Sequence, residues 1–303
     1  MFIKKDLRKI PAILSDAEEK ENVNIRDLRL QRRKAEFKGS IKILASPSHA
    51  PALSNLQSLS LYECEISNID GIGMLESLEC LSLGRNPLKE IPKEFHQLEQ
   101  LKELWMEDCL LQGELPAPIL QLPKLEELRL SNNQIDSLPE TISDLVNLRV
   151  LSLDRNRLKT LPQSLQLLSQ LETLLLRHNE LTQLPEGVPG PLMGSLKLLH
   201  LSSNQLTTLP LSLADCHSLT HIYLNGNHLE SLPDNFDYLL SKSSSLKHCN
   251  LAHNKIDRFP MGSTNADGLM EDVKEGCHIN VRDNPFWKRQ YGSPRDKKRT
   301  AAP

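Results

Sequence analysis

One pattern of 23 residues returns along most of this chain and limits its fold more than any other feature. The copy from Leu125 to Leu145 shows it most clearly, with marked positions at Leu125, Leu128, Leu130, Asn133, Ile135, Leu138, Pro139, Ile142 and Leu145. Similar copies begin at Leu56, Leu78, Leu101, Leu125, Leu148, Leu171, Leu196, Leu219 and Leu246. A repeat of this length predicts one elongated domain in which each copy covers the apolar side of the next.

Each copy changes from strand to turn. Leu128 and Leu130 are two residues apart, so they point to one side of an extended strand, while Glu127 and Arg129 point to the other. The strand cannot continue through the Asn and Leu-Pro positions, because proline lacks a backbone donor and a buried Asn side chain needs backbone partners in a turn. We therefore expect a short strand, a turn and an irregular return in each copy, with the strands of successive copies paired in parallel.

This frame resembles the leucine-rich repeat. The recurring Leu-Pro step resembles the Ras-group subclass, which includes Scribble-, Erbin- and Ras-suppressor-like proteins and their plant intracellular relatives; it occurs at Leu138-Pro139, Leu161-Pro162, Leu184-Pro185, Leu209-Pro210 and Leu232-Pro233. The resemblance implies an α/β fold, a horseshoe-shaped solenoid with a parallel concave sheet, about 9 regular repeats and divergent caps. An aromatic content of 4% agrees with a leucine core.

Two copies depart from this subclass. The copy from Leu56 has Ile69-Asp70 and no proline, and is similar to the repeat of phosphatase regulators. The copy from Leu101 contains the segment Gln112-Gly113-Glu114-Leu115-Pro116 and resembles plant-type repeats.

Irregular segments flank the repeats. We expect residues 1–55 to form a degenerate N-terminal cap, 56–268 the leucine-rich repeats, 269–287 a terminal strand with a C-terminal cap, and 288–303 a disordered tail. Within the first segment Ile25, Leu28 and Leu30 match the strand half of a repeat, whereas an amphipathic helix around residues 16–38 is the alternative. Phe286 and Trp287 are expected to cover the last apolar face.

Charge and cysteine positions indicate the compartment. The net charge is −3, but residues 288–303 carry +5 and the remainder −8. The N-terminal sequence lacks the apolar run of a signal peptide and no stretch is apolar enough to span a membrane, so the sequence predicts a cytoplasmic protein. The basic residues 295–299 leave a nuclear address open. Cys64, Cys109 and Cys249 occupy buried frame positions, which favours free thiols over disulfides.

The sequence contains none of the motifs that mark phosphate-binding loops, GxSxG hydrolases, HExxH metalloproteases or kinases. We therefore expect a non-enzymatic protein without a cofactor or a small-molecule substrate. One alternative uses a cluster of histidines, since His221, His248 and His278 share one outward position on successive strands and His200 and His253 lie close by. These imidazoles could form a metal site or a pH-sensitive contact patch.

Function is then expected on the outward strand positions, which vary while the leucines below them do not. Trp, Tyr and Arg side chains carry most binding energy at protein interfaces. The predicted partner-binding residues are Trp105, Glu107, Arg129, Arg155, Leu175, Arg177, His200 and Tyr223. Glu103, Glu107, Asp108 and Glu127 add acidic groups, so the face is a poor match for nucleic acid, which needs a predominantly basic surface.

The sequence thus predicts an intracellular scaffold that binds a protein on its concave face. The resemblance to the Ras group implies a component of a small-GTPase pathway as the partner. The alternative is a targeting subunit that binds the catalytic subunit of a protein phosphatase.

Overall fold

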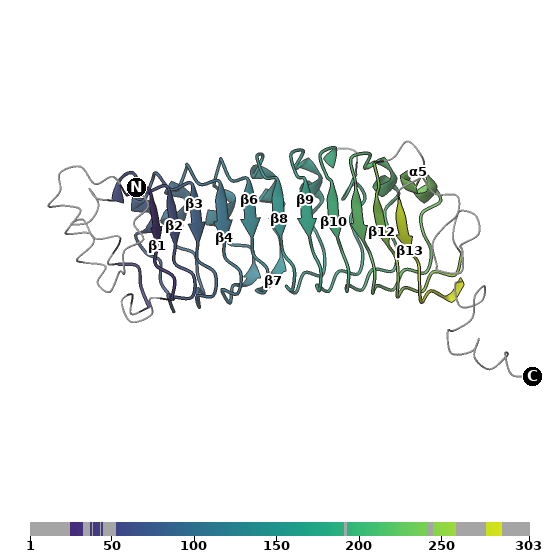
Figure 1. Cartoon of the computed structure of the whole chain (residues 1–303), viewed down its shortest axis with the longest axis horizontal. Helices are drawn as coiled ribbons and strands as arrows, with labels where there is room; N and C mark the ends of the chain where they lie inside the picture. Colours follow the sequence, from purple (N-terminus) through teal and green to yellow (C-terminus); the bar gives the residue numbers. More distant parts are fainter. Residues whose placement is uncertain are drawn as a thin grey trace, which may run out of the picture. The chain divides into compact units, whose positions relative to one another are not determined.

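A computed structural model describes residues 25–32, 37, 39–42, 44, 53–190, 193–240, 245–258 and 277–286. The chain consists of two units, Met1–Asn156 and Arg157–Pro303. In each unit consecutive repeats contribute consecutive, parallel strands (Figure 1). The expected parallel sheet of stacked repeats is therefore confirmed.

In the first unit the parallel strands follow the order β1-β2-β3-β4-β6-β8. Their bounds are β1 Asp27–Arg29, β2 Ser58–Ser60, β3 Cys80–Ser82, β4 Glu103–Trp105, β6 Glu127–Arg129 and β8 Val150–Ser152. A second small sheet pairs β5 Gln112–Glu114 with β7 Gln134–Ser137. Short helices complete the repeats: η1 Ile72–Met74, η2 Lys93–Gln97, α4 Ala117–Leu120 and η3 Glu140–Asp144.

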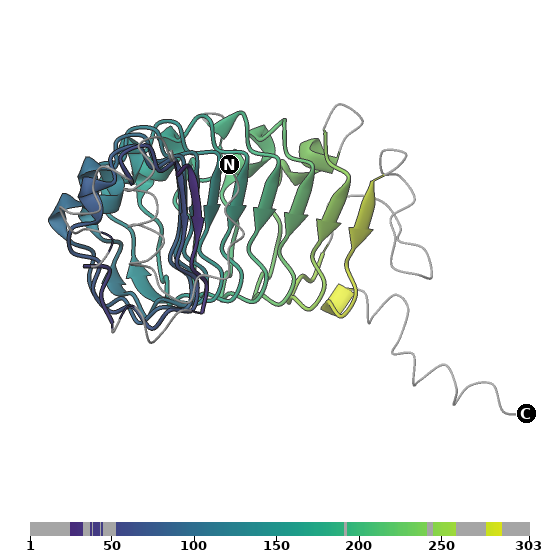
Figure 2. The same ribbon diagram turned by 60° about the vertical axis from the view of Figure 1, so that its left-hand side comes forward.

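In the second unit the order is β9-β10-β11-β12-β13. The strands are β9 Thr173–Leu175, β10 Leu198–His200, β11 His221–Tyr223, β12 His248–Asn250 and β13 His278–Asn280. The helices are η4 Gln163–Leu167, η6 Leu211–Asp215 and α5 Phe236–Leu240. Figure 2, turned from the view of Figure 1, shows the strands of this unit side by side.

Apart from β5 and β7, the middle residue of each strand points inward and belongs to the core. Leu104 of β4 pairs with Leu128 of β6, and both side chains are fully buried. The residue after each strand is buried as well, as Leu130 shows. Only the first and third strand residues face outward, and we name the surface that they form the sheet face. Strands end one residue earlier than the sequence pattern suggested, so the next outward position lies in the turn.

The Leu-Pro step ends the extended segment and starts a 3-10 helix. Pro92, Pro139, Pro162 and Pro210 each precede such a helix in extended conformation, with φ of −68° and ψ of 153° at Pro92. Proline favours this φ, and the donor that it lacks would have no partner in the first turn of a helix.

The described part of the N-terminal segment contains a strand. β1 pairs in parallel with β2, so the helix alternative is wrong over residues 27–29, whose Leu28 points into the core. Residues 1–24, 259–276, Trp287 and the basic tail 288–303 lie outside the described residues. The predictions for the tail and for Trp287 therefore stay predictions.

A ladder of buried asparagines joins each repeat to the preceding one. Asn133 Oδ1 accepts hydrogen bonds from the backbone N–H groups of Cys109 and Leu111, both at 3.0 Å. Its Nδ2 donates to the carbonyl oxygens of Met106 and Leu130, each at 2.9 Å. The same pattern recurs at Asn86, Asn156, Asn204, Asn227, Asn254 and Asn284. These side chains satisfy turn groups that the parallel sheet leaves without partners.

Cysteine replaces asparagine in two copies. Cys64 Sγ donates to the carbonyl oxygen of Leu30 at 2.8 Å, and Cys109 Sγ to that of Leu83 at 3.3 Å. All six cysteines of the chain are free. Burial raises the pKa of the Cys109 thiol to about 12, so it stays protonated and unreactive.

Candidate functional site

The sheet face of the first unit carries a compact group around a tryptophan. Trp105 of β4 lies opposite Arg129 of β6 in the strand register. The indole Nε1 donates to Glu127 Oε1 at 2.9 Å, and the Arg129 guanidinium lies 5.8 Å from the centre of the indole ring. Arg129 also forms an ion pair with Glu127. We name these three residues the tryptophan cluster.

The tryptophan cluster is held in place before any partner binds. Ser82 and Ser152 flank Trp105 and Arg129 in the register, and both serines are buried. The tryptophan is half-buried, and its N–H group already has an acceptor. An aromatic side chain fixed in this way loses little rotamer freedom on binding.

Glu107 lies in the turn after β4. Burial raises the pKa of its carboxyl group, while a hydrogen bond to its own backbone and the charge of Arg129 act in the opposite direction. A half-buried carboxylate of this kind is a good acceptor for a partner's cation, because the cation would compensate the lost solvation.

A second aromatic group lies on the same unit. The Tyr62 ring packs over Gly84, where a Cβ atom would come within 3.1 Å of Tyr62 Cδ2. The Arg85 guanidinium lies 5.5 Å from the centre of the Tyr62 ring. Glycine at position 84 therefore makes room for the tyrosine.

Arg155 does not belong to a strand. It is exposed, and its φ of 56° places it in the left-handed turn before Asn156. The corresponding turn residues share this conformation, among them Arg85, Asp108, Asn132, His178 and Ser203. The sequence pattern predicted Arg155 on the binding face, but the structure puts it at the border of that face.

In the second unit three predicted residues form one row. Leu175, His200 and Tyr223 are register neighbours on β9, β10 and β11, and each is half-buried. The rings of His200 and Tyr223 lie 4.9 Å apart. Arg177 follows β9 and is exposed. These residues give the second unit an aromatic and aliphatic sheet face.

Three histidines continue this surface over the next strands. His221, His248 and His278 occupy the first position of β11, β12 and β13, and they are register neighbours. Their rings stack, with centroids 4.7 Å apart for His221 and His248 and 5.3 Å apart for His248 and His278. Among the residues that the structure describes, no group of three or more His, Cys, Asp or Glu side chains has the arrangement of a metal site. We name the three residues the histidine ladder.

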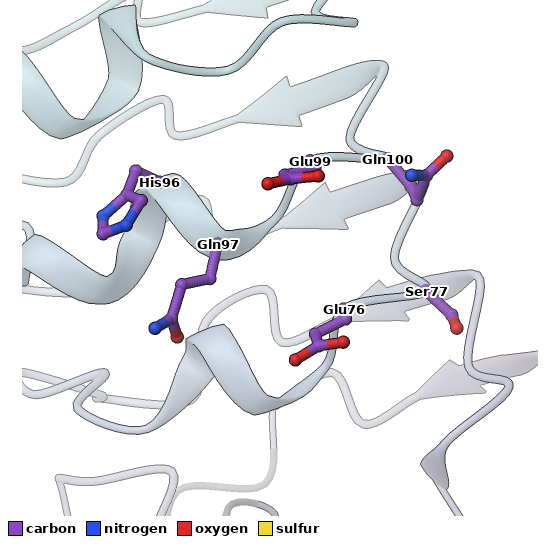
Figure 3. A pocket seen from close by; sticks show the side chains of 6 residues that line it. All are labelled: Glu76, Ser77, His96, Gln97, Glu99 and Gln100. Carbon is purple, nitrogen blue, oxygen red and sulfur yellow. The ribbon is translucent and has the colours of Figure 1, made fainter.

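A hollow lies away from the sheet face of the first unit. It has a volume of about 440 Å³ and is lined by Glu76, Ser77, His96, Gln97, Glu99 and Gln100 (Figure 3). The lining side chains come from two neighbouring repeats and are almost all exposed. This hollow is part of the polar surface and lacks the apolar walls of a small-molecule pocket.

The partners that fix the outward residues were not predicted from the sequence. Glu127 was expected among acidic surface groups, whereas it accepts from Trp105 and pairs with Arg129. Residues two apart on one strand share a face, so Glu127 and Arg129 could have been assigned together. The diagonal contact from Trp105 to Glu127 depends on rotamers that a single sequence does not specify.

Comparison with known proteins agrees with this architecture. Residues 123–181 and 169–229 match the family model described as leucine rich repeat. A segment of 76 residues is 34% identical to the putative neurotrophin receptor LTRK 1 of Lymnaea stagnalis, covering 24% of this chain and 10% of that protein. The chain therefore spans about a tenth of the length of this curated relative. No helix in the described part of the chain is long and apolar enough to cross a bilayer.

Solved structures with the same fold come from bacteria and plants. A leucine-rich-repeat protein of Leptospira interrogans is 26% identical with a TM-score of 0.60, over 85% of this chain and 73% of that one. The Arabidopsis receptor kinase HAESA, solved with the peptide hormone IDA and the co-receptor SERK1, is 25% identical with a TM-score of 0.62, over 86% and 40%. An internalin of Listeria monocytogenes is 24% identical with a TM-score of 0.51, over 70% and 66%. The repeats of this chain are thus leucine-rich repeats, folded as in known leucine-rich-repeat proteins.

Proposed function

We propose that this protein is a non-enzymatic scaffold that binds a protein partner through the sheet face, with the tryptophan cluster as the central contact of the first unit. The leucine-rich repeat is a protein-interaction module, as in the receptor complex of HAESA. The observation that carries the proposal is the Trp105 side chain, held on an outward position by Glu127 and Arg129. Trp105 occupies an outward strand position, so its side chain is not part of the core. Trp and Arg are the residue types that contribute most to binding energy at protein interfaces.

The partner of the first unit should carry cations. Glu103 and Glu127 are register neighbours at the first position of β4 and β6, and Glu107 adds a half-buried carboxylate beyond the end of β4. Lys or Arg side chains of the partner would compensate the charges of Glu103 and Glu107, whereas Glu127 is already paired with Arg129. The tryptophan ring would accept a further cation or an apolar group.

The favoured partner class is a component of a small-GTPase pathway, and the favoured setting is intracellular. Support comes from the Leu-Pro steps of the Ras-group pattern, since Pro139, Pro162 and Pro210 each precede a 3-10 helix. A second candidate is the catalytic subunit of a protein phosphatase. It is favoured by the repeat from Leu56, whose η1 helix follows Gly71 with φ of 86° instead of an extended proline.

Capture from cell lysate at neutral pH, followed by binding measurements with the purified main partner, tests the proposal. Trp105→Ala should weaken that partner's affinity about thirtyfold while the melting temperature changes little. Tyr238→Ala is the matched aromatic control, because Tyr238 is 67% exposed on α5 and lies outside the strands. Mass spectrometry of the captured protein, together with a phosphatase assay, separates the two partner classes.

Equal binding by wild-type protein and Trp105→Ala, with a loss in Tyr238→Ala, would reject the sheet face. Val146→Ala serves as a second control in the first unit, because this side chain is 58% exposed.

A further inference from the structure

The sheet face of the second unit differs in chemistry from that of the first. The strands β10, β11, β12 and β13 contain no Asp or Glu. The residue before each of these strands and the two residues after it, all of them described, are not acidic either. The charged groups at these positions are Lys197, Lys247 and Arg282, and Lys197 is paired with Glu172. Asp283, three residues after the end of β13, lies 3.2 Å from His253. This surface therefore carries ionisable imidazoles with Lys247 and Arg282 beside them and no carboxylate on the strands.

The ionisable centre is the histidine ladder. Its rings lie face to face at the spacing of neighbouring strands, about 4.8 Å. Each ring that gains a proton adds a positive charge next to another ring of the ladder. Two charged neighbours repel each other, so protonation of the ladder is favoured when an anion lies over it.

Polar groups beside the ladder are donors. Asn250 Oδ1 accepts from the backbone N–H of Ala252, and Asn280 Oδ1 accepts from that of Arg282. Each oxygen thus already accepts one bond, and each amide also carries an Nδ2 group with two N–H donors. A surface rich in donors and poor in acceptors fits a ligand that is rich in acceptors.

We propose that the histidine ladder binds an acidic, Asp- or Glu-rich segment of a partner protein, and that this binding strengthens as the pH falls from about 7.5 to about 5.5. Carboxylates remain ionised over this range, because their ordinary pKa is about 4. The proposal deepens the proposed function by naming the partner chemistry of a second surface, and it rests on that function only in using the sheet face.

The charged and titratable groups around the histidine ladder agree with binding that strengthens as the pH falls. Burial lowers the pKa of His221, and the charges of His248 and Lys247 lower it further. His200 and Tyr223 lie on the β10 and β11 side, Lys247 precedes His248 on β12, and Cys277 and Arg282 flank β13. A carboxylate over His221 would act in the opposite direction, because a nearby negative charge favours the protonated ring.

An acidic protein segment fits better than nucleic acid. A phosphate backbone needs a continuous basic stripe with several permanent charges. The permanent positive charges beside the histidine ladder are only those of Lys247 and Arg282 among the described residues next to β11, β12 and β13. A short carboxylate-bearing segment can be neutralised by these few groups once the ladder is protonated.

The test uses the full chain and a fluorescein-labelled peptide of alternating Glu and Gly, at a constant ionic strength of about 50 mM. Anisotropy should show binding about tenfold tighter at pH 5.5 than at pH 7.5. The triple variant His221→Gln, His248→Gln, His278→Gln should lose this gain. The matched control is His96→Gln, His217→Gln, His228→Gln, which removes three exposed histidines outside the strands and should keep it.

Folding is checked by thermal unfolding at pH 7.5, and if the triple ladder variant is unfolded, His248→Gln alone should reduce the acid gain to about threefold. An acid gain that is missing in the wild-type protein, or that is lost equally in both triple variants, overturns the proposal. Tighter ladder-dependent binding of duplex DNA or of anionic lipid vesicles than of the peptide overturns it as well. Since capture through Trp105 is measured at neutral pH, either proposal can fail without the other.

Discussion

At the scale of single residues, the ladder asparagines serve two repeats at once. Asn156 accepts from the backbone N–H of Ile135 at 3.0 Å and donates to the carbonyl oxygens of Leu130 and Leu153. Asn156→Ala would leave these buried groups without partners, at a cost of about 1 to 3 kcal/mol. Arg157→Ala changes an exposed side chain and should stay within about 0.5 kcal/mol. Urea unfolding of the two variants compares their free energies of unfolding. An equal decrease in both variants would contradict the assigned repeat register.

Gly84 is a residue whose size matters. A methyl group there would meet the Tyr62 ring at about 3.1 Å and the Glu107 carbonyl oxygen at 3.3 Å. Gly84→Ala should therefore cost about 1 to 3 kcal/mol. Adding Tyr62→Ala removes the ring, so the double variant should lose less stability than the sum of the single variants. Strict additivity in a thermal-unfolding cycle would show that the ring moves aside freely.

The sequence was a good guide to residues in the repeat frame and a poor one to the contacts between outward residues. Asn133 and its equivalents are predictable, because a buried amide in a repeated turn has few ways to satisfy its groups. The contacts of Trp105 depend on side-chain torsions across two strands. The column of His221, His248 and His278 follows from the period, whereas the stacking of their rings does not.

At the scale of elements, the Leu-Pro step connects an extended segment to a 3-10 helix. Pro139 has φ of −76°, and its carbonyl oxygen accepts from Ile142 N at 3.0 Å. Alanine can adopt the same conformation and keep this bond, so Pro139→Ala should cost only about 0.5 to 1 kcal/mol, through greater freedom of the unfolded chain. Pro139→Gly should cost more. Thr141→Ala is the exposed control, and a loss in the control as large as that in Pro139→Ala would refute this explanation.

Element type was predictable, but element length was not. The alternation of leucines predicted each strand, while the turn after it begins one residue early because the position before the ladder residue is left-handed, as at Asn132 with φ of 58°. The 3-10 helices could not be distinguished from irregular loops by periodicity, since a 3-10 helix of five residues such as η3 makes fewer than two turns. The pairing of β5 with β7 was also not foreseen; β5 lies in the repeat with the plant-type departure, and β7 lies in the repeat that follows it.

At the scale of the whole molecule, His221 makes the stability of the fold depend on pH. The pKa of His221 is lowered in the folded state, mainly by burial, so the unfolded chain binds more protons in the region below its ordinary value of about 6.5. The stabilising contribution is complete above that value and is lost as the pH falls. His221→Gln should therefore show a smaller decrease in melting temperature between pH 7.5 and pH 5.5 than the wild-type protein. A larger decrease in melting temperature in the variant than in the wild-type protein would contradict the expected direction.

The class of the molecule could be predicted from the sequence, whereas its partner could not. Nine copies of one repeat pattern predict a solenoid of stacked repeats, because each copy needs its neighbours to cover its apolar side. The identity of a partner depends on residues that the frame leaves free, and these follow no period. The two sheet faces illustrate this, since one carries Glu103 and Glu127 at the positions where the other carries His221 and His248.

The direction of the asparagine ladder has a consequence for the order in which the protein is made. Asn227 accepts from the backbone N–H of Leu206, and Asn254 from that of Leu229, so each of these turns is completed by the repeat that follows it in the chain. A ribosome delivers the turn first and its partner about one repeat later. We therefore predict that nascent chains fold in steps that trail synthesis by one repeat. Arrest-peptide measurements at successive lengths should show each folding step when the next asparagine leaves the exit tunnel, and steps that coincide with the leucines of the same repeat would contradict this order.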